Sequence, residues 1–90
     1  MATPGFVLLV RQRNDGDAAM RLGITVTKKI GNAVIRNRMK RRFRELARAV
    51  IETNGASGAD HILIGRAGGV ERDFAALKAD LSKALEKATR

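Results

Sequence analysis

The spacing of apolar residues changes abruptly at Gly31-Asn32, and this change limits the folds open to the chain. Before it, Leu22, Ile24 and Val26 alternate with small or polar residues, a period of two that indicates a β-strand with one apolar face. After it, apolar residues recur every three or four positions and fall on one side of an α-helix. The residues in this second pattern are Ile35, Met39, Phe43, Leu46 and Val50. A strand is therefore predicted to lead directly into an amphipathic helix.

Two β-prone runs precede this helix. Phe6 to Arg13 is apolar at its start and ends at residues 14–17, a cluster of Asn, Asp and Gly that is typical of turns. Met20 to Lys28 contains the alternating residues described above. With a loop near residues 14–19, the two runs are predicted to pair directly as an antiparallel hairpin.

The rest of the chain predicts one more strand and two helices. Asn32 can cap the first helix, which should run from about Ala33 to Ile51 or Glu52. Asp60 to Arg66 is short, apolar and β-branched, as strands are. Val70 to Ala88 places its apolar residues on one helical face. The order strand, strand, helix, strand, helix predicts one small α+β domain over residues 1–90, with the apolar face of the sheet packed on both helices.

Positive charge is concentrated on the first helix and on the end of the strand before it. Residues 28–48 include nine Lys or Arg and a single acid, Glu45, so they carry +8 of the net charge of +9. On a helical wheel these basic residues cover nearly everything that the apolar side leaves free. Like charges at i,i+4 destabilise a helix by about 0.2–0.5 kcal/mol per pair, and one Glu cannot neutralise them. The pattern favours a surface that binds a polyanion over a solvated helix, because solvated helices usually mix both signs.

Composition argues against several classes of protein. The chain has no Cys for disulfides or thiolate metal sites, and its longest apolar run is far below the ~20 residues that span a membrane. The N-terminus has no secretory signal, so we expect a soluble cytoplasmic protein without membrane contact. A helix-turn-helix would need a second helix close by, and an RNA-recognition fold would need paired strand aromatics. A pI near 11.4 then predicts an α+β domain that holds structured nucleic acid by its phosphates.

The remaining polar and aromatic candidates favour structural roles. His61 is the only His and has no Cys near it, so we expect a strand-edge residue and not a metal ligand or base. Asp15 and Asp17 fit a turn, and Phe43 and Phe74 fit helix packing. No catalytic residue, metal site or bound cofactor is predicted for this chain.

The basic stretch itself carries a resemblance. The segment KKIGNAVIRNRMKRRFRE, from Lys28 to Glu45, closely resembles the signature of the protein subunit of bacterial ribonuclease P. That signature places Arg-Asn-Arg early in a helix, after Lys-Lys-x-Gly-x-Ala-Val and before Lys-Arg and Arg-Glu. The likeness covers roughly Gly5 to Ala88. It implies a left-handed crossover from the strand before the helix to a parallel neighbour, where a right-handed one is the general rule.

The resemblance also implies a function. The chain would bind a large catalytic RNA and help it remove the 5′ leader from precursor tRNA, as an accessory subunit with no obligate protein partner evident. Catalysis would belong to the RNA and its magnesium ions. The residues expected to contact the catalytic RNA are Lys28, Lys29, Arg36, Asn37, Arg38, Lys40, Arg41 and Arg44. The competing hypothesis is a non-catalytic binder of another folded RNA, like a ribosomal protein.

A second site of the family holds the single-stranded leader between the sheet and an N-terminal helix. We find no counterpart of that helix before the first strand, so the chain is expected to be short at its N-terminus. Leu9 stands where the family often has an aromatic residue. The candidate leader-contacting residues Phe6, Val7 and Leu9 would offer apolar contact without the stacking that is worth ~1–3 kcal/mol per base.

Overall fold

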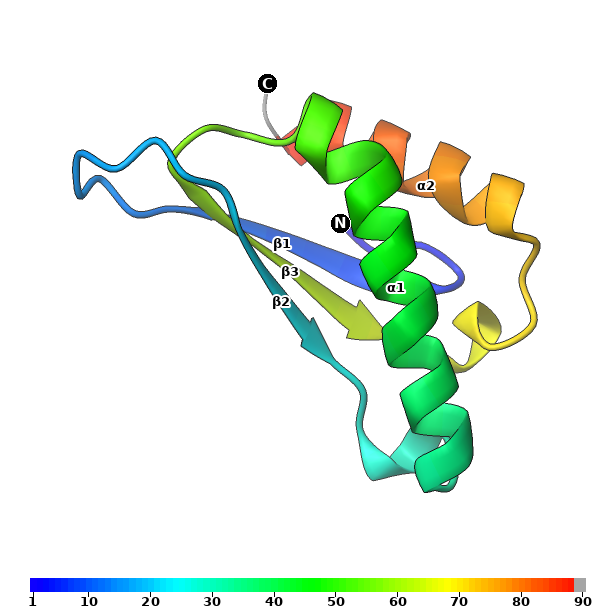
Figure 1. The fold of residues 1–90 in the computed structure, drawn as a ribbon. Helices are drawn as coiled ribbons and strands as arrows, with labels where there is room; N and C mark the ends of the chain where they lie inside the picture. Colours follow the sequence, from blue (N-terminus) through cyan, green and yellow to red (C-terminus); the bar gives the residue numbers. More distant parts are fainter. Residues whose placement is uncertain (89–90) are drawn as a thin grey trace.

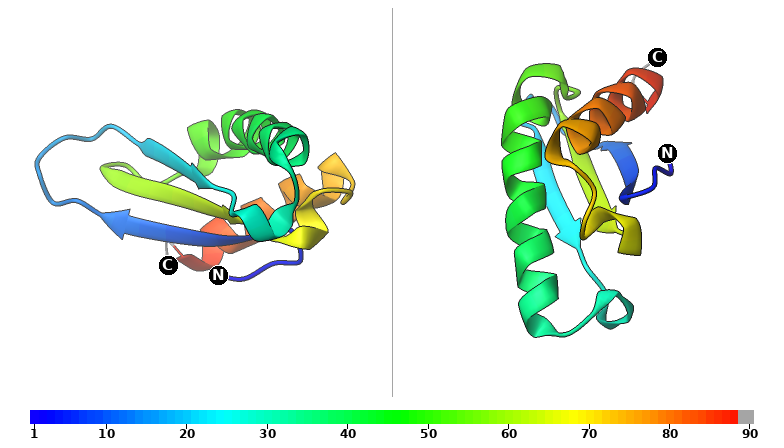
Figure 2. Two further views of the ribbon diagram at one scale, coloured as in Figure 1. Left: turned by 90° about the horizontal axis from the view of Figure 1, so that it is seen from below. Right: turned by 90° about the vertical axis from the view of Figure 1, so that its right-hand side faces the viewer.

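Residues 1–88 are described by a computed structural model that contains three strands and two helices in the predicted order (Figure 1). The elements are β1 (Phe6–Gln12), β2 (Arg21–Thr25), α1 (Ala33–Asn54), β3 (Ala59–Gly65) and α2 (Phe74–Ala88), with short 3-10 turns η1 (Lys28–Ile30) and η2 (Ala67–Gly69). Both helices lie on one side of the sheet (Figure 2). The α+β prediction, with the sheet packed on two helices, is confirmed.

The predicted hairpin between the first two strands is wrong, because β3 lies between them. β3 pairs antiparallel with β1, where Leu8 lies opposite Leu63, and parallel with β2, where Ile24 lies opposite the same residue. Every second residue of β3 is buried, whereas β2 has no fully buried residue. The strand with the most buried residues therefore takes the centre, and the long connection between β1 and β2 leaves room for it.

That connection is organised by Arg13. Its guanidinium donates to Asp15 Oδ2 at 3.0 Å, to Asp60 Oδ1 at 3.1 Å and to the carbonyl of Ala19 at 2.6 Å. The Asp15 carboxylate also accepts from the Asp17 N–H at 3.1 Å, and this bond, with Arg13, holds the pKa of Asp15 below its usual value. The acids near residue 15 thus form a turn, as predicted.

The β2–α1–β3 unit is a parallel crossover with an uncommon hand. In the right-hand view of Figure 2 the helices lie in front of the sheet, β2 and β3 both run downward, and β3 lies to the right of β2. When the strands are turned to run upward, β3 lies to the left of β2. The crossover is therefore left-handed, as the resemblance implied, although about 98% of such units are right-handed.

The core lies between the sheet and the two helices. Phe6 and Phe43 meet edge to face with ring centroids 6.0 Å apart. Gly65 allows α1 to approach β3 closely, since a Cβ there would lie 2.5 Å from Met39 Sδ. Four of the five residues of the predicted helical stripe are buried, and Ile35 near the start of α1 is half-buried. α1 is thereby fixed with one side against the sheet.

The second helix begins later than predicted, at Phe74 instead of Val70. The helix begins after Asp73, whose Oδ2 accepts from the Ala76 N–H at 3.3 Å, as the side chain of an N-cap residue does. The segment before it passes tightly over the N-terminal segment, because a Cβ on Gly69 would lie 2.4 Å from the carbonyl oxygen of Gly5. Residues 70–73 therefore form a connection between η2 and α2.

Candidate nucleic-acid interface

The basic side chains lie on the outward side of α1 because the apolar stripe occupies the inward side. Asn32 caps the helix, accepting from the Ile35 N–H at 3.0 Å. The η1 turn before it places two lysines beside the helix start. Of the eight predicted RNA-contacting residues, Arg36 and Lys40 are half-buried and the other six are exposed. The structure therefore brings all eight onto one continuous stretch, η1 and the first half of α1.

These basic side chains have no ion-pair partner among the described residues. In the part of the chain that the structure describes, the ion pairs are Arg13 with Asp15 and Asp60, and Arg72 with Asp80. None of them involves a basic residue of η1 or α1. The Arg36 Nε atom is buried and has no hydrogen-bond partner among the described residues. A polyanion could pair with the exposed basic groups of this surface without breaking any ion pair described here.

Arg42 is an exception on this helix. Its guanidinium is half-buried and donates to the carbonyl of Val70 at 3.3 Å and to the carbonyl of Arg72. The helical wheel had placed Arg42 on the positive face, and that placement is wrong, because the connection between η2 and α2 lies against this side of α1. Arg42 is a structural residue that ties α1 to the connection before α2.

His61 is not at a strand edge as predicted. It lies on the central strand β3, faces the helices and is 0% exposed. Its Nε2 accepts from the Ala56 N–H at 2.9 Å and so anchors the loop between α1 and β3. Burial lowers the pKa of this imidazole, only partly offset by nearby carbonyls and by Asp60. Across residues 1–88, no group of three or more His, Cys, Asp or Glu is placed to hold a metal ion.

The face of the sheet away from the helices is open and partly apolar. Val7 and Leu9 lie on it opposite Ile64 and Ile62 of β3, and Leu9 is 45% exposed. Phe6 points the other way and is 0% exposed, so the prediction that it contacts a leader strand is wrong. Side chains alternate along a strand, and only the odd-numbered residues of β1 can face a ligand there.

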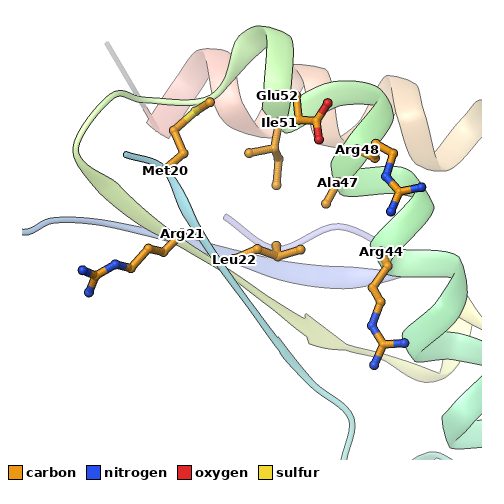
Figure 3. A pocket seen from close by; sticks show the side chains of 8 residues that line it. All are labelled: Met20, Arg21, Leu22, Arg44, Ala47, Arg48, Ile51 and Glu52. Atoms are coloured by element: carbon orange, nitrogen blue, oxygen red, sulfur yellow. The ribbon is translucent and has the colours of Figure 1, made fainter. Parts of the chain in front are cut away.

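A hollow of about 290 Å³ lies between β2 and α1 (Figure 3). Sequence reasoning missed it, because residues 20–22 and 44–52 become neighbours only through the parallel crossover. No short motif in the sequence signals it. Its lining consists of Met20, Arg21, Leu22, Arg44, Ala47, Arg48, Ile51 and Glu52.

Known proteins with a similar sequence and fold identify the family of this chain. A family model described as Ribonuclease P matches residues 1–89. The chain belongs to the ribonuclease P protein family. The resemblance drawn from the Arg-Asn-Arg segment is thus confirmed, and the matches give no support to the ribosomal-protein alternative.

Relatives and solved structures agree with this family. The chain is 59% identical to the ribonuclease P protein component of Erythrobacter litoralis over 88 residues, which are 98% of this chain and 71% of that protein. It is 52% identical to the component of Gluconacetobacter diazotrophicus, covering 96% of this chain and 73% of that one. The RNase P protein from Thermotoga maritima superposes with a TM-score of 0.80 at 31% identity, over 97% of this chain and 80% of the other. No helix within residues 1–88 combines the length and apolar character needed to cross a bilayer.

Proposed function

We propose that this chain is the protein component of a ribonuclease P. It binds the catalytic RNA through η1 and α1, and the assembled enzyme removes the 5′ leader from precursor tRNA in the cytoplasm. In this proposal the chain is an accessory subunit, and the RNA with its magnesium ions performs the cleavage.

The observation that carries the proposal is the unpaired positive charge of α1. A rigid amphipathic helix holds its basic side chains away from the core, and no ion pair of residues 1–88 involves them. A guanidinium group can bind two phosphate oxygens through parallel hydrogen bonds. Without such a ligand, these surface charges are only screened by salt and solvent. The proposed contacts are Lys28, Lys29, Arg36, Asn37, Arg38, Lys40, Arg41 and Arg44.

For the leader of precursor tRNA we propose the open face of the sheet. Val7 and Leu9 of β1 form an apolar strip with Ile62 and Ile64 of β3. This strip contains no aromatic residue, so it can contact bases but cannot stack on them with an aromatic ring. Leader binding is accordingly expected to add less affinity than the basic helix does.

The direct test is cleavage of precursor tRNA by the catalytic RNA at low magnesium, with and without this chain. We expect the chain to raise the cleavage rate, because its positive charge partly replaces the magnesium that screens the RNA. A chain that folds but leaves the rate unchanged would contradict the proposal. Binding to an unrelated folded RNA with equal affinity would instead favour a general RNA-binding role.

A further inference from the structure

The hollow between β2 and α1 has an apolar floor and a basic wall. Leu22, Ala47 and Ile51 form the floor, and Leu22 remains 42% exposed although it is a large apolar residue. Figure 3 shows the guanidinium groups of Arg44 and Arg48 on the helix side, whereas Arg21 points away from the hollow. An occupant must therefore combine an apolar or planar body with negative charge.

The size of the hollow narrows the occupant further. At about 290 Å³ it lies just below the range of small-molecule sites, which begins at roughly 300 Å³. One planar ring system fits such a space, and a second would extend into solvent. Arginine planes stack on nucleobases, and their edges bind phosphate at the same time. Arg44 and Arg48 can provide both contacts to a single nucleotide.

The hollow is continuous with the surface proposed for RNA. Arg44 belongs to both, and Arg48 lies one helical turn further along α1. Glu52 marks the far end of the hollow and would repel a phosphate there. The phosphate of an occupant is therefore expected at the arginine wall, with its base over Leu22 and Ile51.

We propose that this hollow receives one unstacked nucleobase of the bound RNA, whose adjoining phosphate lies on Arg44 and Arg48. The inference rests on the proposed function, because it assumes that the ligand of α1 is RNA. This site adds a contact to a nucleobase, whereas the other contacts proposed for α1 are made to RNA phosphates. Such a contact fixes the register of the RNA along α1, since phosphates alone are equivalent from one nucleotide to the next.

The test uses the full chain labelled with ¹³C at the methyl groups of Ile, Leu, Val and Met, and adenosine 5′-monophosphate as the probe. The ring current of the base should shift the methyl signals of Leu22, Ile51 and Met20 until they saturate. Ribose 5-phosphate, which has the same phosphate and no base, should leave these signals nearly unmoved. Val34 is an internal reference, because it is 66% exposed on the same helix and does not line the hollow.

Two matched variants sharpen the test. Leu22→Asn keeps the side-chain size and removes the apolar floor, so adenosine 5′-monophosphate should bind at least about fivefold more weakly. Val34→Asn makes the same chemical change outside the hollow and should leave this affinity unchanged. Undisturbed methyl signals of the buried Leu63 and Leu81 would show that both variants are folded.

Several outcomes would overturn the base site. These are no shift at Leu22 and Ile51, equal shifts with ribose 5-phosphate, or equal weakening in both variants. If the hollow fails in this way while the chain still stimulates cleavage of precursor tRNA, the proposed function stands without the base site. If the hollow responds but the chain gives no stimulation, the nucleotide site stands and the ribonuclease P role does not.

Discussion

Arg41 and Arg42 are neighbours on α1, yet the structure gives them opposite roles. Arg42 points toward the connection before α2 and donates to the backbone carbonyls of Val70 and Arg72. Arg41 is exposed, and no ion pair of the described residues involves it. One step of about 100° around the helix separates a structural arginine from one that is available to a ligand. Residue type alone therefore does not show which arginines are available to a ligand, whereas their direction relative to the core does.

The largest expected effect comes from the outward side. Replacing Arg36 and Arg38 with Ala should weaken binding to the catalytic RNA by about a hundredfold or more, since each charge-assisted contact contributes roughly 1.5–3 kcal/mol. The thermal midpoint should change little. A filter-binding titration measures the affinity. The matched control is Lys83→Ala with Lys87→Ala, which removes two exposed charges from α2. Equal losses in both double variants would mean that net charge, and not this surface, controls binding.

Arg42→Ala should show the reverse behaviour. Loss of the two carbonyl contacts should lower the free energy of unfolding by about 1.5–3 kcal/mol, because hydrogen bonds to charged groups are strong and the carbonyls lose their donor. RNA affinity of the folded fraction should stay within about twofold, which is less than 0.5 kcal/mol. Urea denaturation measures the stability. Arg41→Ala, the adjacent control, should stay within about 0.5 kcal/mol of the parent. If both variants lose the same stability, the contrast between the two arginines is refuted.

The salt dependence of RNA binding gives a third, smaller difference. Removal of one phosphate contact should make the plot of log affinity against log salt less steep by about 0.7–0.9. Arg41→Ala should show this decrease, whereas Arg42→Ala should retain the parent slope. The measurement is a series of titrations at increasing potassium chloride. An unchanged slope in the Arg41 variant would remove that residue from the interface.

The smallest expected effect is a pH dependence of stability that arises from the buried His61. Its pKa is lower in the folded protein because burial disfavours the charged imidazole. The unfolded chain therefore takes up the proton first, at its ordinary pKa of about 6.5. The contribution of His61 to the free energy of unfolding should be constant above that pH and should fall as the pH drops below it. Urea denaturation from pH 7.5 to 5.5 measures the change.

His61 is the only histidine, which makes the control simple. His61→Gln should be less stable at neutral pH, where the Ala56 N–H loses its usual partner, but its stability should vary less over the same pH range. A variant with the parent's full pH dependence would assign the effect to other groups.

The sequence predicted α1 and the division between its apolar and charged sides well, because both depend on residues that are near one another in the chain. Asn32 caps α1 as expected, and Met39, Phe43 and Leu46 are buried. The exposure of the proposed contact residues could be predicted for the same reason: once the apolar stripe is known, the residues on the outward side follow. The family signature added the hand of the crossover, which no periodicity specifies.

The parts that were missed depend on contacts between distant segments. The strand order could not be read from alternation, because alternation fixes which side a residue faces and not which strand lies beside it. Phe6 belongs to the core since it meets Phe43 across the molecule. The role of Arg42 required the position of residues 70–72, and the hollow required β2 and α1 side by side. Each miss is a tertiary contact that a one-dimensional pattern does not contain.

The central place of β3 has a consequence for synthesis on the ribosome. β1 and β2 both pair with β3, yet β3 follows them and the whole of α1 in the chain. The sheet cannot form until residues 59–65 have emerged, so residues 33–54 are for a time without the surface that buries their apolar stripe. Contacts between distant segments of this kind slow folding. The growing chain therefore exposes its basic segment before the native sheet exists, and completion of the fold must wait for residues 59–65.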